Sequence, residues 1–144
     1  MGTVWWGNDN FHRAIGFSAT LVNVLFQTES HPLGYWEMHS NQSLILNTPR
    51  KDSKIFHNVN DADIYSMLWY GSDLSIANTW YQANGYFNLV LANNRTALQL
   101  QEMGYNTLYE YGYDSTSTVD HCDARILFGP SIVNALQWLW SDAM

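Results

Sequence analysis

The second half of the chain carries two hydrophobic patterns of different period. Small or apolar positions recur every three or four residues, as on one face of a helix; they are Ala92, Thr96, Leu100 and Met103. Gly104 follows, and glycine is a common residue just past a helix end. The aromatic, β-prone run Asn106–Tyr111 comes next and predicts a strand. The chain is therefore expected to pass directly from a helix into a strand.

A second helical pattern lies near the end of the chain. Gly129 and Pro130 are typical of a helix start. The predicted inner face of this helix consists of Ile132, Ala135, Leu136 and Leu139. A polar loop containing Asp120 and His121 separates it from the strand before it. Loops held by rigid elements often carry chemistry, so His121 is a candidate functional residue.

Shorter patterns occur near the start of the chain. Asp9 or Asn10 can cap a short helix over residues 11–16, which ends near Gly16. The apolar run Leu21–Phe26 then predicts a strand that is buried on both faces.

The middle of the chain continues this alternation. Leu44–Leu46 predicts either a short strand or a helical turn, and Ile55–Val59 predicts another strand. The turn-forming residues Asn60–Asp63 come directly after that strand. A helical region is expected over Ile64–Tyr70, with another possible before Gly85.

Alternation of strands with helical stretches predicts an α/β fold. We expect one domain over residues 1–144, built as a three-layer, mostly parallel sheet with flanking helices. In such sheets the functional loops lie at the carboxyl ends of the strands. Asn60–Asp63 and Asp114–His121 each follow a predicted strand, so both loops are expected at one edge of the sheet.

Composition narrows the classes of partner. Apolar residues make up 47% of the chain and the net charge is −7, with six Lys and Arg residues scattered along it. This argues against nucleic acid and anionic membranes, which bind clustered basic residues. The single cysteine, Cys122, excludes an internal disulfide framework and fits a reducing compartment. With neither an export leader nor a long apolar run in the sequence, a cytoplasmic location is expected.

Several stretches, taken in order, follow the pattern of a known family. The helix-then-strand pattern of Phe11–Asn23 resembles the region just after the nucleophile elbow of α/β-hydrolase esterases. The nearest likeness is to ferric enterochelin esterases. Lys54–Asp63 is similar to their strand ending in the triad acid, and Leu91–Asn106 is similar to their last long helix and the strand after it. Asp120-His121 resembles their catalytic-histidine loop, and Pro130–Trp140 resembles their closing helix.

This resemblance implies roles for three residues. His121 would be the general base, and Asp63 the acid that orients it, with Asp61 as the second choice. The alternative from the residues alone is that both aspartates make only turn hydrogen bonds. His121 would then be an ordinary loop histidine.

The chain departs from the family at the nucleophile and at the histidine. No G-x-S-x-G motif occurs, and Gly16–Thr20 lacks the second glycine. In the family the elbow would precede Phe11, so the chain is expected to correspond to the second half of a hydrolase. Thr118–Asp120 precede His121, where the family tends to have glycines.

Other catalytic or cofactor chemistry has little support in the residue pattern. Cys122 lies next to His121, but adjacent side chains rarely point toward each other, so a catalytic thiol is disfavoured. The five histidines lack the close spacings of metal sites, and no glycine-rich nucleotide loop occurs. Neither a metal nor a cofactor is expected.

Two functions of different class remain. The favoured one is a non-catalytic, oligomerising or ligand-binding module, because half of such a sheet leaves an unpaired edge and apolar surface to be covered. Seven Trp and nine Tyr residues fit an interface, and a homo-oligomer, a dimer above all, is expected. The alternative is an esterase-type hydrolase whose nucleophile comes from another chain or from an unusual serine of this one. The serines considered are Ser18, Ser66 and Ser72.

Overall fold

The computed structural model describes residues 10–19, 21, 28–40, 43–60, 88–112 and 130–142, with only the backbone at 60, 130 and 131. Within these ranges three parallel strands form one sheet in the order β1-β2-β3. They are β1 (Arg13–Phe17), β2 (Lys54–Asn60) and β3 (Asn106–Gly112). The strands pair in register, with Ile15 opposite Phe56 and Phe56 opposite Leu108. The sequence-based predictions of β2 and β3 are thereby confirmed.

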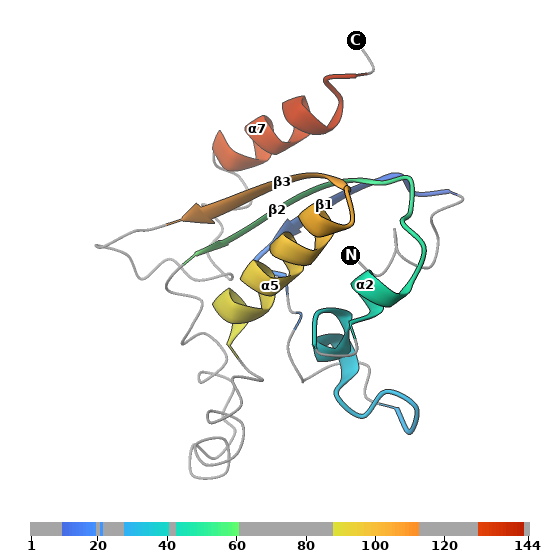
Figure 1. Cartoon of the computed structure of the whole chain (residues 1–144). Coiled ribbons are helices and arrows are strands. Elements are labelled where there is room, and N and C mark those ends of the chain that lie inside the picture. Colours follow the sequence, from blue (N-terminus) through green and yellow to red (C-terminus); the bar gives the residue numbers. More distant parts are fainter. Residues whose placement is uncertain are drawn as a thin grey trace.

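Helices cover both faces of this sheet, as Figure 1 shows. The long helix α5 (Leu89–Glu102) lies on one face, with the short helix α2 (Leu44–Asn47) and the 3-10 helix η1 (Gly34–Met38) on the same side. The helix α7 (Pro130–Leu139) lies on the other face. The predicted α/β architecture, with a parallel sheet between flanking helices, is confirmed.

Helix α5 has well-defined signals at both ends. The side chain of Asn88 accepts a hydrogen bond from the backbone N–H of Leu91 and caps the first turn. At the other end Gly104 has a φ of +71°, the left-handed conformation that glycine adopts without a Cβ clash. Leu100 and the rest of the predicted inner stripe are buried, except Met103, which is partly buried. The predicted helix and its end are therefore confirmed.

Strand β2 is the centre of the hydrophobic core because both of its faces are covered. Ile55 packs toward α5 and α2, in a cluster that includes Leu100 and Tyr105. Phe56 points to the other face and packs against Ala135 and Leu139 of α7 in a second cluster. A third cluster, formed by Leu21, Trp36, Leu89 and Ala92, joins η1 to the start of α5.

The helix expected over residues 11–16 is wrong, since Arg13–Phe17 form strand β1. A short apolar run has no periodicity long enough to distinguish the two structures. Backbone pairing with β2 decides the matter, and it sends Ala14 and Ile15 to opposite faces of the sheet. The strand does not require glycine at position 16, because a Cβ there would make only an ordinary contact with His57.

The inner face predicted for α7 is correct except at one position. Ala135 and Leu139 are fully buried against the sheet, whereas Leu136 is 42% exposed. Each residue turns by about 100° around a helix, so Leu136 is carried off the face that Ala135 occupies. The outer side of α7 is therefore partly apolar.

The remaining element predictions divide into two groups. Leu44–Leu46 form a helical turn within α2, capped by Ser43, so the strand alternative is wrong. Residues 22–26, 64–70 and the helix possible before Gly85 lie outside the described residues. Among the helices that the structure describes, none has the length and apolarity to cross a bilayer. The single domain and the cytoplasmic location stay predictions.

Candidate functional site

The carboxyl ends of β2 and β3 lie side by side, with Asn60 opposite Gly112. Because the strands are parallel, the chain leaves both of them at the same edge of the sheet. The predicted acids Asp61 and Asp63 therefore directly follow one strand end at that edge. These two residues and His121 lie outside the described residues, so their proximity and their roles stay predictions.

Ser18 directly follows β1 at this same edge. Its backbone N–H donates to the carbonyl oxygen of Asn58 over 2.9 Å, and its φ of +44° is unusual for a residue with a side chain. The buried amide of Asn93 on α5 donates to the carbonyl oxygens of Ala19 and Leu89, each at 2.9 Å. Helix α5 thus holds the chain just beyond β1. Ser18 is only 3% exposed, so a substrate could reach its hydroxyl only after local movement.

A row of buried polar side chains lies between α5 and the sheet. His57 of β2 is fully buried, and its ring centroid lies 4.7 Å from that of Tyr109 on β3. Neither ring nitrogen of His57 forms a hydrogen bond within the described structure, and the same holds for Oδ1 of Asn93 and the hydroxyls of Thr96 and Thr107. Burial lowers the pKa of His57 to about 4, and the Asn93 side chain opposes this shift without reversing it. His57 is therefore neutral at pH 7 and enclosed by protein.

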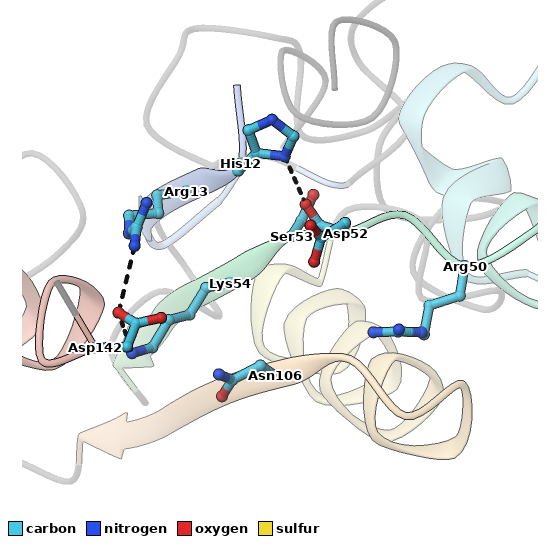
Figure 2. A pocket seen from close by; sticks show the side chains of 8 residues that line it. All are labelled: His12, Arg13, Arg50, Asp52, Ser53, Lys54, Asn106 and Asp142. Atoms are coloured by element: carbon cyan, nitrogen blue, oxygen red, sulfur yellow. Dashed lines mark hydrogen bonds and ion pairs between the residues drawn. The ribbon is translucent and has the colours of Figure 1, made fainter. Parts of the chain in front are cut away.

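A polar pocket of about 290 Å³ lies at the opposite edge of the sheet, where the strands begin (Figure 2). Arg13, Lys54 and Asn106 are the first residues of β1, β2 and β3, and pairing in register brings them together there. The complete lining is His12, Arg13, Arg50, Asp52, Ser53, Lys54, Asn106 and Asp142. The strand starts therefore provide one wall, and the segments before β2 and after α7 provide the rest.

Two cations of this pocket also secure the end of α7. Arg13 donates from Nε to the carbonyl oxygen of Leu139 over 2.8 Å, which places positive charge at the negative end of the helix dipole. Arg13 and Lys54 both contact a single oxygen of Asp142, each at 3.3 Å. Lys54 also lies 4.7 Å from the ring centroid of Trp138. The pKa of Asp142 lies below its usual range, because its own backbone amide and then Arg13 donate to the carboxylate.

On the other side of the pocket, the lining side chains make fewer polar contacts with one another. Arg50 makes one long contact, 3.5 Å, with the carbonyl oxygen of Gly104. His12 donates from Nδ1 to the backbone carbonyl of Asp52 over 2.9 Å, and Figure 2 shows this bond above the pocket. Ser53 is 5% exposed, and its hydroxyl is buried without a hydrogen-bond partner in the part of the chain described. The pocket thus combines unpaired donors with an excess of positive charge.

Sequence reasoning missed this pocket although one signal was present. Three of the six basic residues lie within five positions, at Arg50, Lys51 and Lys54. Arg13, which completes the group, is distant from them in the sequence. Only the parallel pairing of β1 with β2 brings it beside Lys54.

The structure offers little support for bound metal. In the described ranges no three His, Cys, Asp or Glu side chains gather in a way that could hold an ion. The donor set of the pocket, rich in Arg and Lys, also suits an anion rather than a cation. Comparison with known proteins adds no assignment: no family model, no curated protein and no solved structure matches the chain.

Proposed function

We propose that this chain is a non-catalytic α/β module, derived from the second half of an esterase-like hydrolase, that assembles with a second copy of itself. The observation that carries the proposal is the outer side of α7. Val133 and Leu136 of α7 are 51% and 42% exposed, three positions apart on one side of the helix. Trp140, just beyond α7, is 45% exposed, and its ring centroid lies 5.6 Å from the Arg13 guanidinium. Apolar side chains grouped in this way favour burial against a partner.

The edges of the sheet support the same conclusion. Within the described residues, β1 and β3 each pair only with β2. Unpaired backbone groups at a sheet edge invite pairing with another chain. On β3, Tyr111 is half exposed and adds apolar surface beside that edge. A second copy could cover both kinds of surface at once.

The derivation from a hydrolase rests on the order of elements. A strand, a helix, a second strand and a closing helix follow one another as β2, α5, β3 and α7, with the two helices on opposite faces. This order is what the resemblance to ferric enterochelin esterases implies for the region from triad acid to chain end.

The test is the oligomeric state of matched variants, measured by light scattering and sedimentation at micromolar concentration. Wild-type protein should be a dimer, and Leu136→Glu should be largely monomeric because it buries a charge in the proposed interface. Leu98→Glu is the control, since Leu98 is 66% exposed on α5 and lies on the other side of the sheet. A monomeric wild type, or a Leu136→Glu variant that stays dimeric, would contradict the proposal.

A second candidate function is an esterase-type hydrolase completed by another chain, with His121 as base and Asp63 as acid. The observation that favours it is the common edge at which β2 and β3 end. A fluorophosphonate probe should then label a serine of the completed assembly, and His121→Ala should abolish labelling. Labelling of the isolated chain that is lost in Ser18→Ala would instead assign the nucleophile to Ser18. No labelling in either sample would exclude serine catalysis.

A further inference from the structure

We propose that the pocket at the amino-terminal edge of the sheet binds a small oxyanion, the phosphate or carboxylate group of a small ligand. This inference does not rest on the proposed assembly, although Arg13 of the pocket lies against Trp140, which belongs to the proposed assembly surface.

The distribution of charge is the first argument. The chain has a net charge of −7 and only six basic residues, yet Arg13, Arg50 and Lys54 all line this one pocket. Such grouping costs repulsion between the cations unless negative charge lies among them. The lining carboxylates, Asp52 and Asp142, leave an excess of positive charge. An anion would remove that excess.

The unused donors are the second argument. A guanidinium has five N–H groups, and among the described residues Arg50 uses one of them in a single 3.5 Å contact. Figure 2 shows the Arg50 side chain extending toward Asn106, whose own amide points away from Arg50. A phosphate or carboxylate can accept two parallel hydrogen bonds from such a guanidinium.

Ser53 supplies an independent observation. Its hydroxyl is one of the buried groups without a hydrogen-bond partner in the described structure, and Ser53 lines the pocket. That oxygen is enclosed by protein in the present conformation, so the segment of residues 50–53 would have to shift slightly before a bound oxyanion could accept its hydrogen bond.

Asp142 explains how the pocket is stable without a ligand. One oxygen of this carboxylate contacts both Arg13 and Lys54, and the Asp142 side chain is 56% exposed. An exposed carboxylate just beyond α7 can move away without unpacking the core. A bound oxyanion would therefore replace Asp142 on the two cations. The pocket volume of about 290 Å³ is at the small end for ligand sites and limits the ligand to a compact molecule or one end of a longer one.

The experiment is a calorimetric titration of the whole chain with inorganic phosphate and, separately, with succinate, at constant ionic strength set by chloride. Saturable binding is expected for at least one of the two, and the tighter arm identifies the group. Arg50→Gln should weaken binding by roughly tenfold. Lys51→Gln is the matched control. Lys51 is the neighbour of Arg50 in the sequence and carries the same charge, but it does not line the pocket. Its affinity should change by less than about twofold.

Asp142→Asn tests the exchange step. Removing the competing carboxylate should tighten binding by roughly tenfold, while circular dichroism confirms that each variant is folded. Absence of saturable binding to wild-type protein in both arms would overturn the proposal. Equal losses in Arg50→Gln and Lys51→Gln would also overturn it, because they would show a response to net charge alone. Weaker binding by a folded Asp142→Asn variant would overturn the exchange of Asp142 for the ligand.

Discussion

At the scale of single residues, two buried histidines define the conditions under which the fold is stable. His39 and His57 both have pKa values lowered to about 4, chiefly because burial disfavours the charged ring. The nearby positive charge of Arg95 lowers the pKa of His39 further. His39 donates from Nε2 to the carbonyl oxygen of Leu21 over 2.9 Å, a bond that the neutral ring can make. Both rings are therefore uncharged in the folded protein.

Lowering the pH should begin to destabilise the protein near pH 6.5, well above the pH range in which carboxylates titrate. In the unfolded chain both rings regain a pKa near 6.5, so between pH 6.5 and 4 the unfolded state binds protons that the folded state excludes. Stability is thus fully present above pH 6.5 and falls as the pH drops toward 4. His57 alone should contribute a loss of about 2 kcal/mol between pH 7 and pH 5. Urea unfolding at the two pH values measures it.

The matched variants for this prediction are His57→Gln and His12→Gln. The first removes a buried titrating ring, so its free energy of unfolding should change less between pH 7 and pH 5 than that of wild-type protein. The second removes an exposed ring and should leave the wild-type difference in place. An unchanged pH dependence in His57→Gln would show that His57 is not buried in its neutral form.

At the scale of elements, the end of α5 is the best-specified feature of the chain. The backbone N–H of Gly104 donates to Gln101 and that of Tyr105 donates to Leu100, the two bonds of a Schellman motif. Leu100 and Tyr105 also share a hydrophobic cluster, which is the contact that accompanies this motif. The sequence predicted this helix end from glycine alone, because only the backbone conformation of that residue was in question.

Substitution of Gly104 should measure the free-energy cost of the left-handed backbone conformation, because packing contributes little at this position. In the described part of the chain, no atom beyond Gly104 and its two neighbours lies within 4 Å of the position that a Cβ would take. Gly104→Ala is therefore opposed by the φ of +71° and not by a clash. The expected loss in the free energy of unfolding is about 1 kcal/mol. Gly104→Asn should lose less, because asparagine tolerates this conformation better. Equal losses in the two variants, measured by urea unfolding, would contradict this explanation.

Elements long enough to repeat their hydrophobic pattern several times were predictable, and the short elements near the start of the chain were not. The stripe of α5 and the β-prone run of β3 each repeat often enough to exclude the other structure. Arg13–Phe17 are five residues long, and their strand conformation comes from pairing with β2. Leu136 differs from its prediction for a related reason, since hydrophobicity alone does not tell a buried position from an exposed one.

At the scale of the whole molecule, the two edges of the sheet carry different candidate chemistry. In the sequence, Asp61 and Asp63 come after β2, and His121 comes after β3. The cationic pocket lies at the other edge, where the strands begin. Parallel strands separate these edges by the full strand length, so the cationic pocket lies away from the edge at which the chain leaves β2 and β3. Assembly through α7 would use a third surface of the molecule.

If assembly and folding are coupled, thermal stability should depend on protein concentration. A dimer is favoured over unfolded monomers by mass action, so the Tm of wild-type protein should rise measurably with each tenfold increase in concentration. The Tm of Leu136→Glu should stay constant over the same range. Differential scanning calorimetry on both proteins gives the comparison. A wild-type Tm independent of concentration would argue that folding does not require the second copy.

The sequence by itself determined the fold class, the central and last strands, and both long helices, because their local periodicities agree with the tertiary structure. It also indicated which loops follow the strands at the expected catalytic edge. Only the tertiary structure decided that Arg13–Phe17 form a strand. The pairing of this strand with β2 places Arg13 beside Lys54 and so forms one wall of the pocket. Arg13, Arg50 with Lys54, and Asp142 come from three separate segments. Their grouping depends on strand register and on the packing of α7, which no local pattern encodes.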